Sequence, residues 1–593
     1  MLLISKIIII FNNIYIINST MKKFKGTGAS VGVAYAKAYI LKTPKFDIKQ
    51  KKITNPKTEF AKFKKALEKS VSQLNKVKAI AAKKLGAEKA EIFDAHIQII
   101  SDPEIANEVE TTVKEQKHNI EYIAAAVFDK YHNTFAAMDD PYFKERAADV
   151  IDVKNRLLSN LLDVELPDIL NIDKESIIVA HDLTPSETAL LNKDYIKGFV
   201  TDIGGRTSHA AIMARTMEIP AVLGLKSITS SVDKNSYIAI DGKTGEVEIN
   251  PKNKKEWQNK IAAFKKNQTE LKKYINVKTC TKDGVHVHIE ANIGKPEDAI
   301  SAQSYGCEGI GLFRSEFLYM DNDNWPTEDQ QFEAYKKALQ ACKNQLVVIR
   351  TLDIGGDKKL SYFTFPQEMN PFLGYRAIRL CLDKPKMFKT QLRALGRASV
   401  YGKLAIMFPM IATIDEFKKA KKMALDCFKQ LKKEGHKVSD NIQLGMMVEI
   451  PSAAILADKF AVHSDFFSIG TNDLNQYSFA CDRMSKEVSY LYQPNNPSLL
   501  RMINSTIQGG HSQKRWVGMC GEMAGDVLSV PILLGLGLDA FSMSATSIPQ
   551  ARKIINSLSK AECVELAKQA LELETIDQVN ALVTKFLKSK KLI

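Results

Sequence analysis

Cysteine is scarce in this chain and occurs only from Cys280 onward. There are 8 Cys among the 593 residues, and no two of them are separated by just two residues. A disulfide framework or a cysteine zinc site would need paired spacing. Reduced thiols without such pairs indicate a cytoplasmic protein.

Long hydrophobic runs are also lacking. The isoleucine-rich stretch at residues 7–11 is interrupted by Asn12 and Asn13, and no small-x-small cleavage site follows it. A transmembrane helix needs about 20 apolar residues, so we expect no stable membrane insertion. We interpret residues 1–20 as a disordered tail or an upstream start-site artefact ahead of Met21.

The chain has no block of five or six consecutive Lys or Arg, although its formal net charge is +15. Charge spread over helical stretches is typical of a solvated surface, and no recognition motif accompanies it, so we expect no nucleic-acid binding. Hydrophobic residues make up 45% and charged residues 25%, the balance of a globular protein. The length exceeds a single core of about 250–300 residues and predicts two to four domains.

Helical periodicity dominates residues 54–165. Apolar residues recur at three- and four-residue spacing over 60–80, 92–100, 120–131 and 143–162. This pattern predicts four antiparallel helices in a bundle-like subdomain. Residues 91–140 carry eleven Asp or Glu against three Lys, which suits either an ordinary solvated face or a docking surface for a basic partner.

Short apolar segments on both sides of this stretch predict an α/β domain made of residues 21–53 and 166–251. Strands are expected at 176–180, 198–201, 221–223, 237–240 and 246–249. Residues 252–279 are polar, rich in Lys and helical in pattern, which indicates a helical linker.

From residue 280 to 593, eight β-rich segments alternate with helix-patterned segments. The β-rich segments are 286–291, 309–313, 346–352, 404–410, 442–448, 466–469, 516–519 and 541–543. The order fits a (β/α)₈ barrel, whose active site lies at the carboxyl ends of the strands. A doubly wound open sheet is the alternative.

Polar residues follow five of these β-rich segments. They are Arg314, Arg350, Asp353, Glu449, Asn472, Asp473 and Cys520. In a barrel they would converge on one mouth, where the charged groups would lack partners without a ligand. Arginines bind phosphate or carboxylate, the two acidic residues Glu449 and Asp473 suit Mg²⁺, and the thiol of Cys520 could protonate an enolate. The set predicts a site for a small phosphorylated acid with a divalent metal.

A second candidate centre is the stretch GGRTSH at residues 204–209, which opens the apolar helix expected at 210–217. Backbone N–H groups at a helix start favour phosphate. His209 is therefore placed to carry a phosphoryl group on an imidazole nitrogen.

Seven motifs, in this order along the chain, carry a resemblance to a known family. They are LTPSET (183–188), GGRTSHAAIMAR (204–215), GLFRSEFLYM (311–320), RTLDIGGDK (350–358), NPFLGYRAIR (370–379), IGTNDLNQY (469–477) and GMCGEMAGD (518–526). From about residue 21 to the C-terminus, the chain resembles the phosphoenolpyruvate–protein phosphotransferases, the enzyme I family of the bacterial sugar phosphotransferase system.

The resemblance implies a role for each candidate residue. His209 would take the phosphoryl group of phosphoenolpyruvate on Nε2, and Cys520 would donate the proton that converts enolpyruvate to pyruvate. Glu449 and Asp473 would bind Mg²⁺. The substrate would be bound by Arg314, Arg350, Asn472, Asp473 and Arg483.

The resemblance also implies partners and motion. Residues 54–165 would dock the phosphocarrier protein HPr, which takes the phosphate on its own histidine, and the barrel would form a homodimer. Because His209 and the substrate site lie in different domains, the linker at 252–279 is the expected hinge. The alternatives are a fragment of a dikinase- or synthase-type phosphoenolpyruvate enzyme, which would need a nucleotide-binding region, and an inactive regulatory homologue.

Overall fold

A computed structural model describes residues 22–593 apart from 42–45, 86–89, 91, 139–140, 167–168, 170–171, 185–186, 189, 206–207, 321, 323, 357, 359, 484 and 486. The extension predicted at 1–20 lies outside the described residues. The chain divides into two compact units, Met1–Asn267 and Gln268–Ile593. Each unit is described by itself.

The first unit contains a mixed sheet of eight strands in the order β1-β8-β7-β3-β4-β5-β6-β2. β3 to β6 run parallel in sequence order, whereas β1, β2, β7 and β8 pair antiparallel with their neighbours. All five strands expected beyond the helical stretch are present. The strands are β1 (Lys22–Lys25), β2 (Thr27–Ser30), β3 (Val33–Leu41), β4 (Ser176–Ala180), β5 (Ile196–Thr201), β6 (Ala221–Leu223), β7 (Tyr237–Asp241) and β8 (Glu246–Ile249). The helices α9 (His209–Met217) and α10 (Ile228–Ser231) accompany them, and α11 (Lys254–Lys272) runs past the end of this unit at Asn267.

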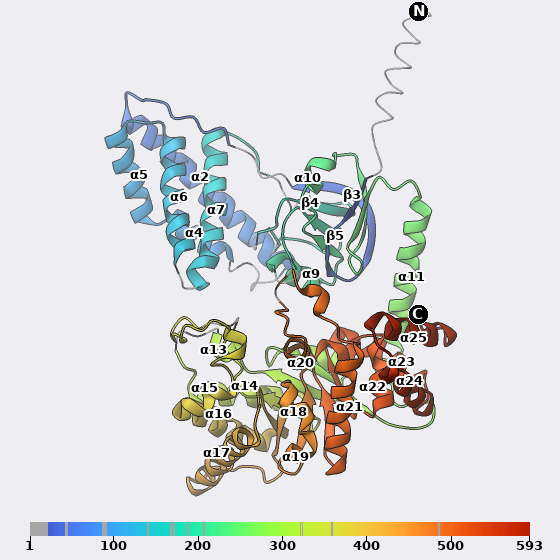
Figure 1. The fold of residues 1–593 in the computed structure, drawn as a ribbon. Coiled ribbons are helices and arrows are strands. Elements are labelled where there is room, and N and C mark those ends of the chain that lie inside the picture. The colour runs from blue at the N-terminus through green and yellow to red at the C-terminus, as the bar shows by residue number, and fades with distance from the viewer. Residues whose placement is uncertain are drawn as a thin grey trace, which may run out of the picture. The chain divides into compact units, whose positions relative to one another are not determined.

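Between β3 and β4 the chain forms a helical bundle with its own hydrophobic core (Figure 1). The described residues form five long helices there, one more than the periodicity predicted: α2 (Pro56–Leu85), α4 (Ile92–Ile100), α5 (Pro103–Gln116), α6 (Ile120–Ala137) and α7 (Pro141–Leu162). The additional helix is α5. The side chain of Asp102 caps its amino end, Pro103 occupies the first helical position, and Ile105, Val109 and Val113 are buried.

The second unit is a closed barrel of eight parallel strands, which confirms the predicted (β/α)₈ fold and excludes the open sheet. Its strands are β9 (His288–Ile293), β10 (Gly309–Arg314), β11 (Leu346–Arg350), β12 (Lys403–Phe408), β13 (Gln443–Val448), β14 (Phe466–Ile469), β15 (Trp516–Met519) and β16 (Ala540–Met543). All eight β-rich segments of the sequence therefore became barrel strands. They are buried almost throughout, since helices cover one face and packed side chains fill the other.

Helices connect and cover the barrel strands. They are α12 (Asp298–Ser304), α13 (Phe317–Met320), α14 (Glu328–Ala341), α15 (Ile378–Asp383), α16 (Pro385–Ala398), α17 (Ile414–Lys433), α18 (Pro451–Ile455), α19 (Ala457–Ala461), α20 (Thr471–Ser478), α21 (Pro497–Ser512), α22 (Ser529–Leu536), α23 (Ile548–Asn556), α24 (Lys560–Glu572) and α25 (Ile576–Ser589), with short 3₁₀ turns between some of them. Among the described residues, no helix combines the length and hydropathy needed to cross a membrane.

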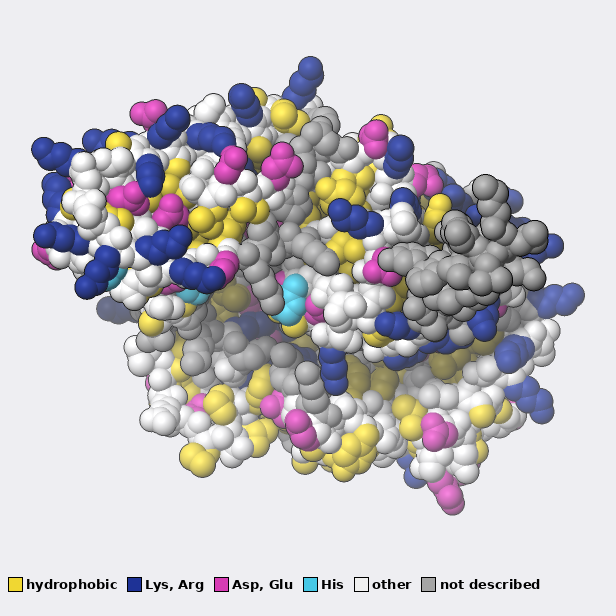
Figure 2. Space-filling view, turned by 90° about the horizontal axis from the view of Figure 1, so that it is seen from above, with side chains coloured by type: hydrophobic (Ala, Val, Ile, Leu, Met, Phe, Trp, Pro, Cys, Tyr) yellow, Lys and Arg dark blue, Asp and Glu magenta, His cyan; other side chains and the backbone are white. Residues whose placement is uncertain are grey.

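The excess of basic residues is distributed over the surface. On the face shown in Figure 2, Lys and Arg side chains lie scattered among acidic and hydrophobic ones. Many lysines form exposed ion pairs with nearby carboxylates, such as Lys422 with Asp426 at 2.9 Å and Lys432 with Asp440 at 2.5 Å. Such a distribution is typical of a solvated surface.

Candidate active site

The carboxyl ends of five barrel strands bring the predicted residues together at one end of the barrel. Arg314 and Arg350 are the last residues of β10 and β11, and they are paired in register. Glu449 directly follows β13. Asn472 and Asp473 lie in the first turn of α20, which begins at Thr471 just after β14, and Cys520 directly follows β15. Because all eight strands are parallel and the barrel is closed, the residues at their carboxyl ends converge at one end of the barrel, as the sequence pattern predicted.

Arg350 lies in a buried network of charges rather than free at the mouth. Its Nη2 pairs with Glu316 Oε1, and its Nη1 lies 2.9 Å from Asp353 Oδ2. Arg376 Nη2 lies 2.8 Å from the other oxygen of Asp353, and Lys358 Nζ lies 2.9 Å from Glu316 Oε1. Although burial opposes it, the charges of Arg350 and Arg376 lower the pKa of Asp353. The network thus keeps both carboxylates ionised and fixes the Arg350 guanidinium.

Sequence reasoning missed three members of this network: Glu316, Lys358 and Arg376. Each falls inside a motif that carries the family resemblance, within 311–320, 350–358 and 370–379. They do not directly follow a strand, so a search confined to strand ends could not find them. The sequence did offer one signal for these three residues. Each is a charged residue that lies beyond the end of a strand, in a glycine-containing motif.

Glu449 and Asp473 form a buried pair of carboxylates. Burial, followed by the charge of Asp473, raises the pKa of Glu449 to about 8. Glu449 Oε1 accepts a hydrogen bond from the Met410 backbone N–H at 2.5 Å. Asp473 Oδ1 is buried and accepts no hydrogen bond from a described residue, although Arg483 Nη1 lies 3.2 Å away. Two adjacent buried carboxylates with spare acceptor capacity fit a divalent cation such as Mg²⁺.

Two further predicted residues lie beside these charges. Arg314 has an exposed side chain and makes no ion pair within the described part of the chain, so its guanidinium is available to an anion. Asn472 Oδ1 accepts a hydrogen bond from the Tyr492 hydroxyl at 3.1 Å. That contact leaves the amide nitrogen of Asn472 as a donor.

Cys520 is held rigidly and is almost fully buried. Its backbone N–H donates to the Ile469 carbonyl at 3.1 Å, and its carbonyl accepts from Asn292 Nδ2 at 2.9 Å. Burial raises the pKa of the Cys520 thiol. The group therefore carries its proton at neutral pH, which a proton donor requires.

The second candidate centre is the start of α9 in the first unit. The helix begins at His209, one residue before the predicted start, and Ser208 is its N-cap, with Oγ accepting from the Ala211 backbone N–H at 3.3 Å. Arg206, Thr207 and the His209 side chain lie outside the described part of the structure. Backbone N–H groups in the first turn of α9, from His209 onward, are of the kind that favour an anion.

Sequence families match three successive stretches of the chain. Residues 25–146 match the PEP-utilising enzyme, N-terminal family, and residues 172–245, which contain α9, match the PEP-utilising enzyme, mobile domain family. Residues 268–560, which contain all eight barrel strands, match the PEP-utilising enzyme, PEP-binding domain family.

Curated relatives extend the match to almost the full length. The phosphoenolpyruvate-protein phosphotransferase of Mycoplasma capricolum is 56% identical over 95% of this chain and 99% of its own length. The chain belongs to the phosphoenolpyruvate–protein phosphotransferase family. Phosphotransferases of Staphylococcus carnosus and Listeria monocytogenes are 53% and 52% identical, over 96% and 95% of this chain and 100% and 99% of their own lengths. These relatives support the phosphotransferase interpretation over a dikinase- or synthase-type fragment.

Proposed function

We propose that this phosphotransferase moves the phosphoryl group of phosphoenolpyruvate to His209, with release of pyruvate, and then to a histidine of HPr. This is the first step of the sugar phosphotransferase system. The observation that carries the proposal is the convergence of three arginines with two buried carboxylates at the carboxyl end of the barrel. Arginine forks and a carboxylate pair together suit a small acid that bears a phosphoryl group.

In this proposal the barrel residues bind and orient the substrate. Arg314, Arg350 and Arg483 neutralise the phosphate and carboxylate of phosphoenolpyruvate, and Asn472 donates a further hydrogen bond. Glu449 and Asp473 would hold Mg²⁺, and Asp473 also fixes Arg483. Mg²⁺, when bound, supplies positive charge to the phosphoryl oxygens. Such charge neutralisation supports phosphoryl transfer, because most of its catalysis is positioning and electrostatics.

The chemical step joins His209 to the phosphoryl group. His209 Nε2 forms a bond to phosphorus while the phosphorus–oxygen bond to enolpyruvate breaks, and the electron pair stays on the enolate oxygen. The proton of Cys520 Sγ then goes to the terminal carbon of the enolate, which gives pyruvate. A buried, protonated thiol suits this donor role, and solvent later restores its proton.

The remaining assignments concern domains and partners. Residues 54–165 dock HPr, and the acidic residues of 91–140 suit a basic partner surface. Residues 21–53 and 166–251 form the phosphohistidine domain, residues 252–279 act as the hinge, and residues 280–593 bind substrate and form a homodimer in the cytoplasm. A cross-link that fixes the phosphohistidine domain to the barrel should abolish turnover; full activity of the cross-linked enzyme contradicts the hinge.

Incubation with phosphoenolpyruvate labelled in its phosphoryl group tests the proposal. With Mg²⁺, the full-length protein should take up acid-labile label, and HPr should discharge it. His209→Ala should take up none, whereas His436→Ala, which alters an exposed histidine elsewhere, should be labelled like the wild type. Labelling of His209→Ala, or a wild type that is labelled only with ATP present, contradicts the assignment.

A further inference from the structure

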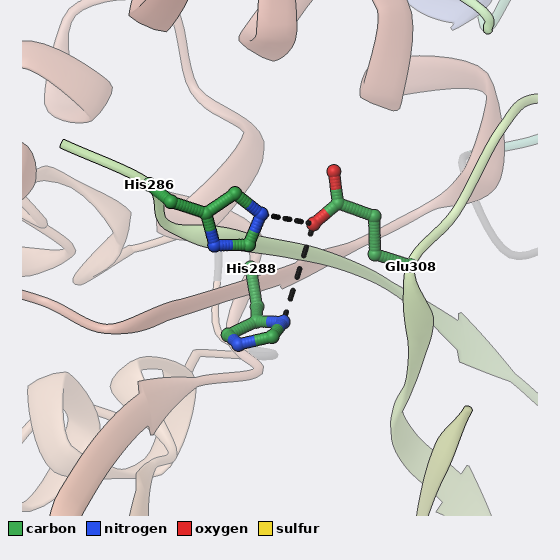
Figure 3. Close-up of side chains that lie close together, drawn as sticks. All are labelled: His286, His288 and Glu308. Atoms are coloured by element: carbon green, nitrogen blue, oxygen red, sulfur yellow. Dashed lines mark ion pairs between the residues drawn. The ribbon is translucent and has the colours of Figure 1, made fainter. Parts of the chain in front are cut away.

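Two histidines and a glutamate gather at the opposite end of the barrel from the candidate active site. His286 Nε2 lies 3.4 Å and His288 Nδ1 lies 4.0 Å from the same oxygen, Glu308 Oε2 (Figure 3). One atom from each of the three side chains lies within 4.8 Å of the others. His288 opens β9 and Glu308 directly precedes β10, so the cluster lies at the amino ends of the strands. The proposed reaction uses the carboxyl ends.

The local fold explains why these side chains meet. His286 and His288 are two residues apart in extended chain, so their side chains point to the same side. Their rings lie edge to face with centroids 4.9 Å apart. β9 and β10 are parallel neighbours in the barrel, with Ala291 paired to Ile310. The residue that precedes β10 is thereby placed beside the start of β9.

Glu308 is fixed from behind by buried partners. Its Oε1 accepts hydrogen bonds from Thr279 Oγ1 at 2.6 Å and from the Thr279 backbone N–H at 3.3 Å. Arg552 Nη2 lies 3.6 Å from the same oxygen, and Arg552 and Thr279 are both buried. These contacts leave Oε2 directed at the imidazoles. Hydrogen-bonded support behind a ligand carboxylate is characteristic of metal sites.

A simple ion pair explains the geometry less well. His288 Nδ1 at 4.0 Å is beyond hydrogen-bond reach of Glu308. Two imidazoles directed at one carboxylate oxygen, without a hydrogen bond from the second, are better accounted for by a shared cation.

We propose that His286, His288 and Glu308 bind Zn²⁺, with water as the fourth ligand. Zinc–nitrogen and zinc–oxygen bonds of about 2.0–2.2 Å in a tetrahedron place two ligand atoms about 3.3–3.5 Å apart. The His286–Glu308 separation of 3.4 Å matches this spacing, and the His288 ring, whose Nδ1 lies 4.0 Å from the same oxygen, would move closer on binding. Two imidazoles with one carboxylate select zinc over Mg²⁺, which prefers oxygen ligands. The ion would join the amino ends of β9 and β10 and stabilise the barrel without entering the reaction.

Equilibrium dialysis of the full-length protein against Zn²⁺ tests this site. The protein is first treated with EDTA, and excess Mg²⁺ is kept present to occupy the candidate active site. Wild type should bind Zn²⁺ saturably, and His286→Ala and His288→Ala should each weaken the binding at least tenfold. Thr279→Val removes the hydroxyl that donates to Glu308 Oε1 and accepts from Arg552 Nε, and it should weaken the binding about 10-fold or more. His436→Ala is the matched control and should bind as the wild type does.

Thermal unfolding provides a second readout. Zn²⁺ should raise the Tm of the wild type and of His436→Ala, because a ligand that binds only the folded state stabilises it. It should leave the double variant His286→Ala/His288→Ala unchanged. Both histidines are partly exposed, with side chains 33% and 59% accessible, so the variants should unfold like the wild type without Zn²⁺. No saturable Zn²⁺ binding by the wild type, or equal affinity of the wild type and the double variant, overturns the proposal.

Discussion

Replacing Asp353 by Asn tests how the buried charges behind the candidate active site are maintained. Asp353 is 2% exposed and contacts Arg350 at 2.9 Å and Arg376 at 2.8 Å through its two oxygens. The substitution keeps the shape and removes the charge, so two buried guanidinium groups lose their shared counter-ion. Breaking a buried pair in this way costs about 3–5 kcal/mol. We expect Asp353→Asn to lower the free energy of unfolding of the barrel by that amount.

Asp440→Asn is the matched control, because it removes the same charge from an exposed ion pair with Lys432. It should cost at most about 1 kcal/mol. Urea unfolding of the full-length protein, followed by tryptophan fluorescence, measures both, since Trp325 and Trp516 lie in the barrel. Equal costs for the two variants would refute the reasoning.

The difference in unfolding free energy between the wild type and Asp353→Asn depends on pH, and the direction of the Asp353 pKa shift determines how. The folded state lowers the pKa of Asp353, so its stabilising contribution is fully present above the unfolded value of about 3.9. It is lost only as the pH falls below that value towards the folded pKa. The deficit of Asp353→Asn should therefore shrink in acid, below about pH 4. A deficit that does not shrink there contradicts the assigned ionisation of Asp353.

Three further substitutions have defined outcomes. Cys520→Ala should lower kcat for pyruvate formation by about 10²–10⁴-fold, as loss of a general acid does, in an assay that reduces pyruvate with NADH; an unchanged kcat excludes the thiol as donor. Burial raises the pKa of Glu187 to about 7 in the folded state, whereas the unfolded chain has the ordinary value of about 4.3. Ionisation of Glu187 therefore lowers the free energy of unfolding progressively as the pH rises from about 4.3 to about 7. Glu187→Gln should be more stable than the wild type above pH 7 and lose that advantage in acid, in unfolding titrations at several pH values; a pH-independent difference excludes this cause. Ser208→Ala removes the α9 cap and should destabilise that helix by about 1 kcal/mol, seen as faster amide hydrogen exchange in α9 but not in α17.

The sequence predicted the barrel well because most of its strands are buried on both faces and therefore appear as largely apolar runs. Val347, Val348 and Ile349 of β11 are an example. Helix α5 was missed because its buried residues, Ile105, Val109 and Val113, form one narrow stripe within an acidic segment. The capped start at Asp102 and Pro103 was a usable signal that periodicity alone did not include.

Only those residues of the candidate site that lie at the ends of strands could be predicted from the sequence. The residues that end a strand or directly follow one, such as Arg350 and Glu449, could be placed at one mouth from the order of strands alone. The rest of the network could not be placed in this way. Glu316, which pairs with Arg350, and Arg376, which pairs with Asp353, approach through loops whose paths depend on tertiary packing. The zinc-site candidate was missed for the same reason, since Glu308 meets the two histidines only when β9 and β10 become neighbours.

Closure of the barrel joins the first and last of its strands, which has a consequence for synthesis on the ribosome. β16 pairs with β9, and the Ser542 hydroxyl donates to Asn292 Oδ1 across 250 residues of chain. Until β16 has left the ribosome, β9 and β15 each present an unpaired edge, and such edges invite aggregation. The nascent barrel therefore keeps these unpaired edges until near the end of translation, whereas the strands of the first unit are all available much earlier.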